Sequence, residues 1–317
     1  VKIMATPNKK REYTYGIGYG TDTGVRTRLG IEFKRINQRG HKVDTELLLS
    51  EVKQSFIAQY VVPFGKPGGD SLRYQAKYEQ EEVGDGNAKR FFLGASFNDR
   101  WRGWQRRFYL DYLHETFEFG DTREIVNFLI PGINLSFAKA DNLLLPQQGY
   151  SWFFDLHGGT EAIISDTSFL QARAVGQRVW SPSARSRILA KMEYGATTVD
   201  SFSALPTTER FFAGGDRSVR GYAYQSLAPE DNDGNTIGGR YLLTSSLEAD
   251  YLIYNNMGAA IFFDAGDASD NNHFDLNRAY GIGFRWASPV GMFRLDFARP
   301  LDDEKNFRIH IGIGADL

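Results

Sequence analysis

The 317-residue sequence contains no cysteine, which excludes disulfide bonds, thiol catalysis and cysteine-ligated metal sites. It has no run of about 18 consecutive apolar residues, which excludes a transmembrane helix. Its 37 basic and 39 acidic residues give a net charge of −2, so no basic field for nucleic acid is expected. The mean hydropathy of −0.40 is compatible with a membrane β-barrel, whose strands alternate lipid-facing apolar residues with polar residues that face the lumen.

Local motifs for catalysis and metal binding are also missing. Gly214-Gly215-Asp216-Arg217-Ser218 lacks the Gly-Lys-Ser/Thr that completes a phosphate-binding loop, and no Gly-x-Ser-x-Gly elbow occurs. The five histidines are spread over different segments. Asp231-Asn232-Asp233-Gly234-Asn235 is similar to part of a calcium loop, but Leu242 stands where a bidentate glutamate is required. We expect no enzyme, metal or cofactor, although serine and histidine on neighbouring strands could still form a lipase site.

Aromatic residues and glycines are abundant instead, and they follow a two-residue period. The sequence has 24 Phe, 16 Tyr and 33 Gly, with the glycines scattered along the chain. In residues 12–21, tyrosine and isoleucine side chains alternate with Thr14 and with Gly16, Gly18 and Gly20, so one face is apolar and the other nearly bare. Similar alternation recurs in about sixteen segments, an even number within the range of single-chain outer-membrane barrels.

This pattern predicts an all-β fold, a 16-stranded antiparallel transmembrane β-barrel that covers residues 11–317. The alternative is a pair of soluble β-sandwiches, whose strands also alternate. Many segments, however, reach the ~9–11 residues that a strand needs to cross a bilayer. Aromatic residues such as Trp101, Trp104 and Trp180 also lie near segment ends, where an interfacial girdle belongs.

A connection of roughly forty residues separates the segments that end near Val199 and begin near Arg240, far longer than a hairpin turn. It contains Arg220 among glycines and aromatic residues. These apolar residues allow the loop to pack against another part of the protein, and an arginine buried inside a barrel would require carboxylate partners. Glu248 and Asp264 are candidates because the alternation places both on the polar face.

The run from Arg210 to Tyr222, Arg-Phe-Phe-Ala-Gly-Gly-Asp-Arg-Ser-Val-Arg-Gly-Tyr, resembles the lumen-inserted loop of the outer-membrane protein assembly superfamily, which includes the BamA, TamA and two-partner secretion families. Its continuation through Pro229 is most similar to the TamA family. The resemblance implies a lumen loop lock, in which Arg220 pairs with strand carboxylates while Gly221 permits a tight tip. The implied members are Val219, Arg220, Gly221, Tyr222, Glu248 and Asp264.

The same resemblance implies a location in the outer membrane of a Gram-negative bacterium and a non-enzymatic role. A TamA-like protein would insert or secrete autotransporters and other outer-membrane proteins. Its partners would be unfolded client proteins, outer-membrane lipid and an inner-membrane-anchored protein of the TamB type. Residues 1–10 would be a linker from preceding periplasmic POTRA domains. The alternative function is a protein-secreting pore of the two-partner secretion type.

Glycines at both ends of the predicted barrel indicate a weak lateral seam. The first strand carries Gly16, Gly18 and Gly20, and the last carries Gly312 and Gly314. Glycine weakens a strand because it has no side chain to pack. An incompletely paired edge can template an incoming strand by β-augmentation, so we expect this seam to act on client strands.

Overall fold

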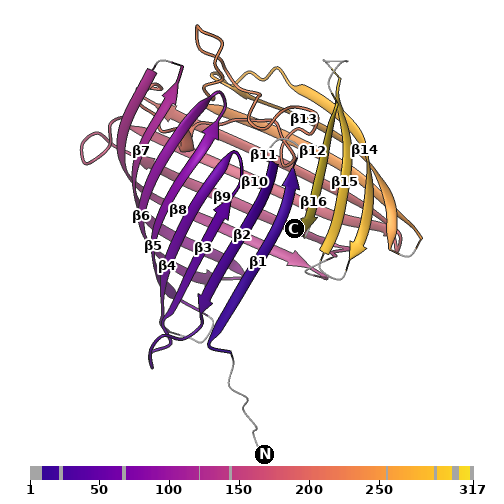
Figure 1. Cartoon of the computed structure of the whole chain (residues 1–317), viewed down its shortest axis with the longest axis horizontal. Coiled ribbons are helices and arrows are strands. Elements are labelled where there is room, and N and C mark those ends of the chain that lie inside the picture. The colour runs from indigo at the N-terminus through magenta and orange to yellow at the C-terminus, as the bar shows by residue number, and fades with distance from the viewer. Residues whose placement is uncertain are drawn as a thin grey trace, which may run out of the picture.

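The computed structural model describes residues 9–20, 24–65, 69–120, 122–142, 145–254, 256–288, 291–301 and 307–314. Within these residues, sixteen strands form one sheet in strict chain order, wrapped into a nearly closed barrel (Figure 1). The strands are β1 (Arg11–Gly20), β2 (Gly24–Phe33), β3 (Lys42–Leu49), β4 (Lys53–Pro63), β5 (Ser71–Val83), β6 (Gly86–Trp101), β7 (Trp104–Phe119), β8 (Thr122–Ala140), β9 (Gly149–Gly159), β10 (Phe169–Ser183), β11 (Ser186–Val199), β12 (Tyr241–Tyr254), β13 (Met257–Ser269), β14 (Asn277–Ser288), β15 (Gly291–Pro300) and β16 (Arg308–Gly314).

The two faces of the sheet differ as the period-two pattern predicts. On β1, Tyr15 and Ile17 are 75% and 83% exposed on the outer surface. On β12, the outward Leu247 is 56% exposed whereas the inward Glu248 is 6% exposed. The predicted sixteen-stranded antiparallel barrel is therefore confirmed, with an apolar exterior that suits contact with lipid. No helix among the described residues is long and apolar enough to cross a membrane.

The antiparallel ladders are long between most neighbouring strands and shorter near the last strand. The β6–β7 ladder runs from Asn87 opposite Glu118 to Trp101 opposite Trp104, whereas β16 has only 7 residues. β1 and β16 lie side by side and complete the circle (Figure 1). Yet no backbone ladder joins β1 to β16 in the part of the chain that the structure describes.

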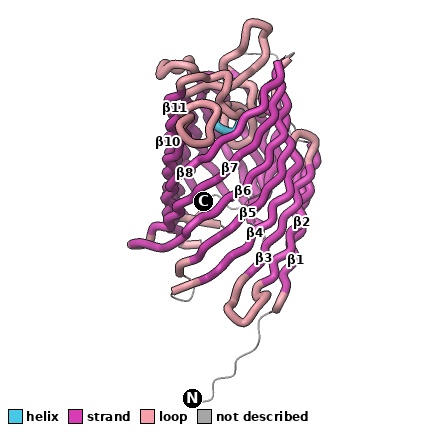
Figure 2. Tube along the Cα trace, turned by 90° about the vertical axis from the view of Figure 1, so that its left-hand side faces the viewer, coloured by secondary structure: helices cyan, strands magenta, loops and turns pink. Residues whose placement is uncertain are grey.

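The two ends of the barrel differ in what fills them. Because strand direction alternates, β1 begins at the same end as the tight turns at residues 102–103 and 184–185, and residues 200–240 leave from the opposite end. We call these the turn end and the loop end. Figure 2 shows the loop segments gathered at the loop end. Residues 1–8 of the predicted linker lie outside the described residues.

A hydrophobic core lies inside the barrel at the loop end. The loop contributes Leu205, which is fully buried, together with Phe202, Phe212 and Ile237. The inner wall contributes residues of β5 to β8 and β10: Val83, Ala88, Leu113, Phe117, Phe119, Val126, Phe128, Ile130 and Phe169. Burial of these side chains holds the loop against the wall, so residues 200–240 form a packed plug in this mouth of the barrel.

Candidate functional site

Arg220 connects the loop to the C-terminal wall through Asp264 of β13. Its Nε donates to Asp264 Oδ2 over 2.8 Å, its Nη2 donates to Oδ1 over 3.0 Å, and its backbone N–H donates to Oδ2 over 3.1 Å. Asp264 is completely buried. One carboxylate therefore fixes both the main chain and the side chain of Arg220, with charge-assisted hydrogen bonds that are stronger than neutral ones.

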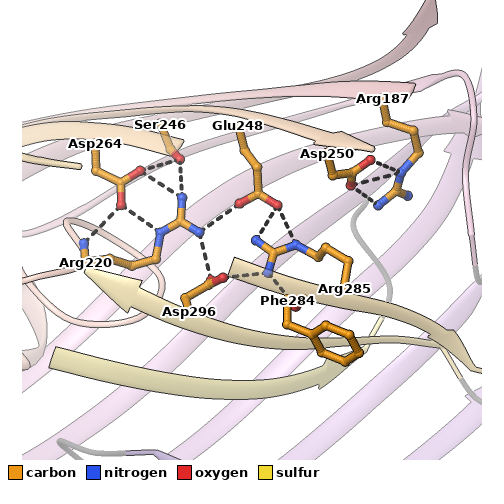
Figure 3. Close-up of polar contacts among 9 residues, drawn as sticks. All are labelled: Arg187, Arg220, Ser246, Glu248, Asp250, Asp264, Phe284, Arg285 and Asp296. Carbon is orange, nitrogen blue, oxygen red and sulfur yellow. Dashed lines mark hydrogen bonds and ion pairs between the residues drawn. The ribbon is translucent and has the colours of Figure 1, made fainter. Parts of the chain in front are cut away.

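Two further carboxylates and a second arginine complete this site (Figure 3). Arg220 Nη1 donates to Glu248 Oε2 over 2.8 Å and to Asp296 Oδ2 over 3.0 Å. Arg285 binds the other oxygens of the same two carboxylates, over 2.6 Å to Glu248 Oε1 and 2.5 Å to Asp296 Oδ1. Ser246 Oγ bridges to Asp264 over 2.6 Å. We call these six residues the Arg220 cluster.

The structure thus brings Arg220 together with both carboxylates named from the sequence, and it adds Asp296 and Arg285, which sequence reasoning missed as partners. Alternation along β14 and β15 places both side chains on the inner face. The alternation in the sequence therefore already marked both residues as possible partners of a loop inside the barrel. Removing one partner from such a buried network is costly because it leaves an uncompensated charge.

The neighbours of Arg220 explain why the tip is built from small and apolar residues. Val219 is fully buried. Gly221 has a φ of 105°, and a Cβ there would lie 3.1 Å from Ala279 Cβ and 3.2 Å from the Pro300 nitrogen. The Arg220 guanidinium also lies 3.5 Å from the centre of the Phe262 ring, a cation–π contact. Tyr222 is more peripheral, and its hydroxyl donates to the Arg278 carbonyl over 3.4 Å.

A second anchor holds the start of the loop to β6 and β7. The short 3₁₀ helix η1 (Thr207–Glu209) presents its first residue to Glu115, whose Oε1 accepts from the Thr207 N–H over 2.6 Å and from its hydroxyl over 2.7 Å. Arg90 donates to Glu115 Oε2 over 2.9 Å and to Thr207 Oγ1 over 2.6 Å. Arg90, Glu115 and Thr207 are all nearly or fully buried. The sequence analysis did not identify this anchor.

Glu209, the last residue of η1, and the next residue, Arg210, are also held by hydrogen bonds. Glu209 Oε2 lies 2.7 Å from His157 Nε2 on β9. Arg210 donates to the Leu205, Ile237 and Ser203 carbonyls over 2.9, 3.2 and 3.0 Å. Burial lowers the pKa of Arg210 to about 10 despite the opposing charge of Glu115. Arg210 therefore organises the loop from within, and its guanidinium also lies over the wall residues Phe117 and Phe119 of β7, at 4.9 and 5.4 Å from the ring centres.

The loop also reaches the N-terminal wall, on the other side of the β1–β16 seam. Tyr224 donates from its hydroxyl to Glu81 Oε1 on β5 over 3.2 Å, and the Gln225 side chain accepts from the Gly84 N–H over 3.3 Å. Asp216 lies 3.6 Å from Arg26 on β2. The loop therefore spans the lumen, with the Arg220 cluster on one side of the seam and these contacts on the other.

Comparison with known proteins identifies the family. Residues 19–316 match the Omp85 superfamily domain. The chain belongs to the Omp85 superfamily. It is 26% identical over 323 residues to the outer membrane protein assembly factor BamA of Nitratidesulfovibrio vulgaris. The aligned region covers 94% of this chain but only 40% of that protein. An Omp85 barrel with an apolar exterior belongs in the outer membrane of a Gram-negative bacterium.

Solved structures give the same fold. BamA from Haemophilus ducreyi lacking POTRA domains 1–3 superposes with a TM-score of 0.83 at 16% identity, over 97% of this chain and 70% of that one. CdiB from Acinetobacter baumannii superposes with a TM-score of 0.62 at 14% identity, over 97% of this chain and 60% of that one. At these identities the superpositions show a shared architecture.

In this Omp85 barrel, the glycines named for the seam lie on its two border strands. On β1, Gly16 pairs with Arg28, Gly18 with Arg26 and Gly20 with Gly24. On β16, Gly312 pairs with Arg294 and Gly314 with Met292. A Cβ built on Gly312 would meet nothing within 4 Å, so the inner face of the last strand is open at this position.

Proposed function

We propose that this Omp85 barrel promotes the insertion of outer-membrane proteins by offering the edges of β1 and β16 to client strands. One observation carries the proposal: β1 and β16 are neighbours, yet no backbone ladder joins them among the described residues. Every other neighbouring pair of strands is joined by a ladder. The seam is therefore the place where the sheet opens at the lowest cost.

The physical reason lies in backbone hydrogen bonding. Each intramolecular hydrogen bond contributes about 0.5–1.5 kcal/mol net, so a seam without a continuous ladder lacks several such contributions. Unpaired N–H and C=O groups on an edge are a template for another strand. In a membrane an incoming β-strand needs such partners, because lipid offers none. Pairing with β1 or β16 would satisfy a client strand while it folds.

The Arg220 cluster and the N-terminal contacts of the loop suggest how the seam is kept together. We infer that the loop acts as a tie across the lumen: Arg220 holds β12, β13 and β15, while Tyr224 and Asp216 hold β5 and β2. The charge-assisted contacts of Arg220 are more numerous and more buried than the contacts of Tyr224 and Asp216 with the N-terminal wall. On opening, the loop would stay with the C-terminal wall and release the N-terminal wall first.

Within the superfamily we propose a TamA-type role, which rests on the sequence run from Val219 to Pro229. Autotransporters would then be among its clients, and a TamB-type protein anchored in the inner membrane would be its partner. The chain spans about 40% of the length of the BamA relative that it matches. The test therefore needs the full natural protein.

The experiment is a reconstitution. The full natural protein is placed in phospholipid vesicles, an unfolded outer-membrane barrel is added, and folding is followed by the change in gel mobility of heat-resistant folded barrel. We expect faster folding than in empty vesicles and in vesicles that hold an unrelated barrel of similar size. Equal folding rates in all three would reject the assembly function.

A secreting pore of the two-partner type is the second candidate, and the similarity of fold to CdiB is the observation in its favour. The hydrophobic plug formed by Leu205 and its neighbours argues against a passive channel. Single-channel recording of the same reconstituted protein separates the two. The assembly function predicts little steady current, whereas a large current that persists when the loop is mutated would support a pore.

A further inference from the structure

The inner wall carries a groove with a mixed polar and apolar lining near the turn end, far along the strands from the plug. Gln105, Ser136, Ser151 and Gln177 line a cavity of about 320 Å³ together with Phe153 and Val175. The registers place these residues side by side across four strands: Gln105 opposes Ser136, Ser136 opposes Phe153, and Phe153 opposes Val175. This volume is at the lower end of the ~300–1,000 Å³ range of ligand sites.

Two arginines with unused hydrogen-bonding capacity lie on the inner wall beyond the β7 side of the groove, outside its lining. Arg107 lies two residues from Gln105 on the same face of β7 and opposes Asn98 and Asn134. Arg73 of β5 opposes Ser96, the neighbour of Asn98 on the inner face of β6. The Nε atoms of both arginines are buried and have no hydrogen-bond acceptor among the described residues. We call the groove and these two arginines the turn-end groove.

The acidic surroundings of the two arginines are sparse. Arg107 Nη2 forms an ion pair with Asp111 at 3.6 Å, which is longer than a hydrogen bond. Within the described residues Arg73 forms no ion pair with an acidic side chain. Asp155, the next carboxylate along the wall, is already bound by Tyr109 and His157. Asp111 therefore balances part of the charge of Arg107, whereas Arg73 has no acidic partner among the described residues, so this corner favours an anionic group.

The chemistry of the lining selects the kind of ligand. Glutamine side chains and serine hydroxyls donate and accept hydrogen bonds without charge, which suits the alternating N–H and C=O groups of an extended main chain. Phe153 and Val175 provide a small apolar contact. Arginine provides a planar fork for a carboxylate. We propose that the turn-end groove binds an extended polypeptide segment that carries an acidic side chain, with the carboxylate at Arg73 and Arg107.

This inference rests on the proposed function for the origin of the peptide, an unfolded client that enters at the turn end. The groove lies on the lumen side of the sheet, away from the apolar exterior. A client segment bound there would be held inside the barrel before its strands pair at the seam. The groove would therefore act as a receiving site that is separate from the edges of β1 and β16.

Peptide binding to the full protein in detergent tests the assignment. The probes are two fluorescent twelve-residue peptides of alternating serine and aspartate or alternating serine and asparagine, followed by anisotropy. We expect the acidic peptide to bind at least about tenfold more tightly, and to lose at least about tenfold in affinity in the double variant Arg73→Gln, Arg107→Gln. The matched control is Arg178→Gln, an exposed arginine beside Gln177 on the outer face of β10, which should leave binding unchanged.

Three outcomes overturn the proposal: equal binding of the two peptides, equal loss in the control variant, or displacement of the acidic peptide by glycerol phosphate at equal concentration. The last result would assign the arginines to a phosphate headgroup. Folding of each variant is checked by heat-resistant gel mobility. A photo-reactive benzoylphenylalanine at Gln105 should crosslink the acidic peptide, whereas one at its outward neighbour Trp104 should not, and this arm remains decisive if the arginine variants fail to fold.

The reconstitution assay separates this inference from the proposed function. Normal client insertion by the double variant, together with unchanged binding of the acidic peptide, rejects the turn-end groove alone. Peptide binding that depends on the two arginines, without acceleration of client folding by the natural protein, rejects the assembly function alone.

Discussion

Arg220 and Asp264 are joined through both the main chain and the side chain of the arginine. The backbone N–H and the guanidinium Nε of Arg220 donate to the same oxygen of Asp264, over 3.1 Å and 2.8 Å. Because Asp264 is fully buried in the wall of β13, this contact determines where the loop tip lies and how it is oriented. The position of the whole plug depends on it.

Arg220→Ala should release the loop tip without preventing barrel formation. Removal of one partner from a buried ionic network costs about 3–5 kcal/mol, and it leaves Arg285 to hold Glu248 and Asp296 while Asp264 loses its arginine partner. We expect faster hydrogen exchange and proteolysis in residues 210–228. The matched control is Arg217→Ala, since the Arg217 side chain is exposed and its carbonyl, which accepts from Lys191, is kept in the variant. Equal protection in the two variants would contradict this role of Arg220.

Gly221→Ala should disturb the same contact by crowding. A Cβ at Gly221 meets Ala279 and Pro300 at 3.1–3.2 Å, whereas one at Gly234 meets nothing within 4 Å. Both glycines have positive φ, so both substitutions carry the cost of placing alanine in that backbone conformation. The difference between the two variants in loop protection therefore measures the effect of packing. We expect Gly221→Ala to lower loop protection by about 1–3 kcal/mol more than Gly234→Ala, measured by hydrogen exchange. A larger effect at Gly234 would refute the close approach.

Thr207→Val should loosen the first anchor. The hydroxyl of Thr207 donates to Glu115 and accepts from Arg90, so its loss leaves buried polar groups unsatisfied at a cost of about 1–3 kcal/mol. Thr208→Val is the control, because the Thr208 hydroxyl lies 3.4 Å from Glu115. We expect residues 203–210 to exchange faster only in the first variant. Similar exchange in both would show that the anchor depends on the backbone alone.

Ile282→Arg tests the lipid-facing assignment. Ile282 lies within β14 and is 64% exposed, whereas Ile163 is 66% exposed but lies in the loop between β9 and β10. An arginine on the lipid face near the midplane costs about 2–4 kcal/mol, so refolding into lipid vesicles in a urea titration should be weakened for Ile282→Arg and unchanged for Ile163→Arg. Equal stability would place Ile282 away from lipid.

The sequence predicts the strands and their facing well because alternation is local. Each residue of β12 is assigned to a face by its neighbours alone, and Glu248 followed from this rule. The same rule fails at the loop end of β7, where Phe117 and Phe119 face inward although they are apolar. Their inward position depends on the plug that covers them.

Contacts between the loop and the distant wall could not be predicted in the same way. Glu115 and Thr207 are separated by 92 positions, and no local pattern indicates that they meet. Two partners of Arg220 could be predicted because a family resemblance singled out the arginine, and because alternation along the strands showed which carboxylates lie on the inner face. Alternation also places Arg285 and Asp296 on the inner face. The path of the loop, which the sequence does not reveal, decides which of these inward charged residues its tip reaches.

The seam is tested most directly by a disulfide across it, and the barrel sequence itself contains no cysteine that would compete. One cysteine replaces Tyr15 on β1 and the other replaces Ile309 or Ile311 on β16, whichever position crosslinks. The control pair replaces Tyr15 and Leu29, which already oppose each other in the β1–β2 ladder. All barrels should be heat-resistant when oxidised.

Client folding is then measured with the full natural protein in vesicles, before and after reduction. We predict that the oxidised seam pair abolishes the acceleration of client folding and that reduction restores it, while the oxidised control pair remains active throughout. Full activity of the demonstrably crosslinked seam pair would contradict a lateral opening between β1 and β16.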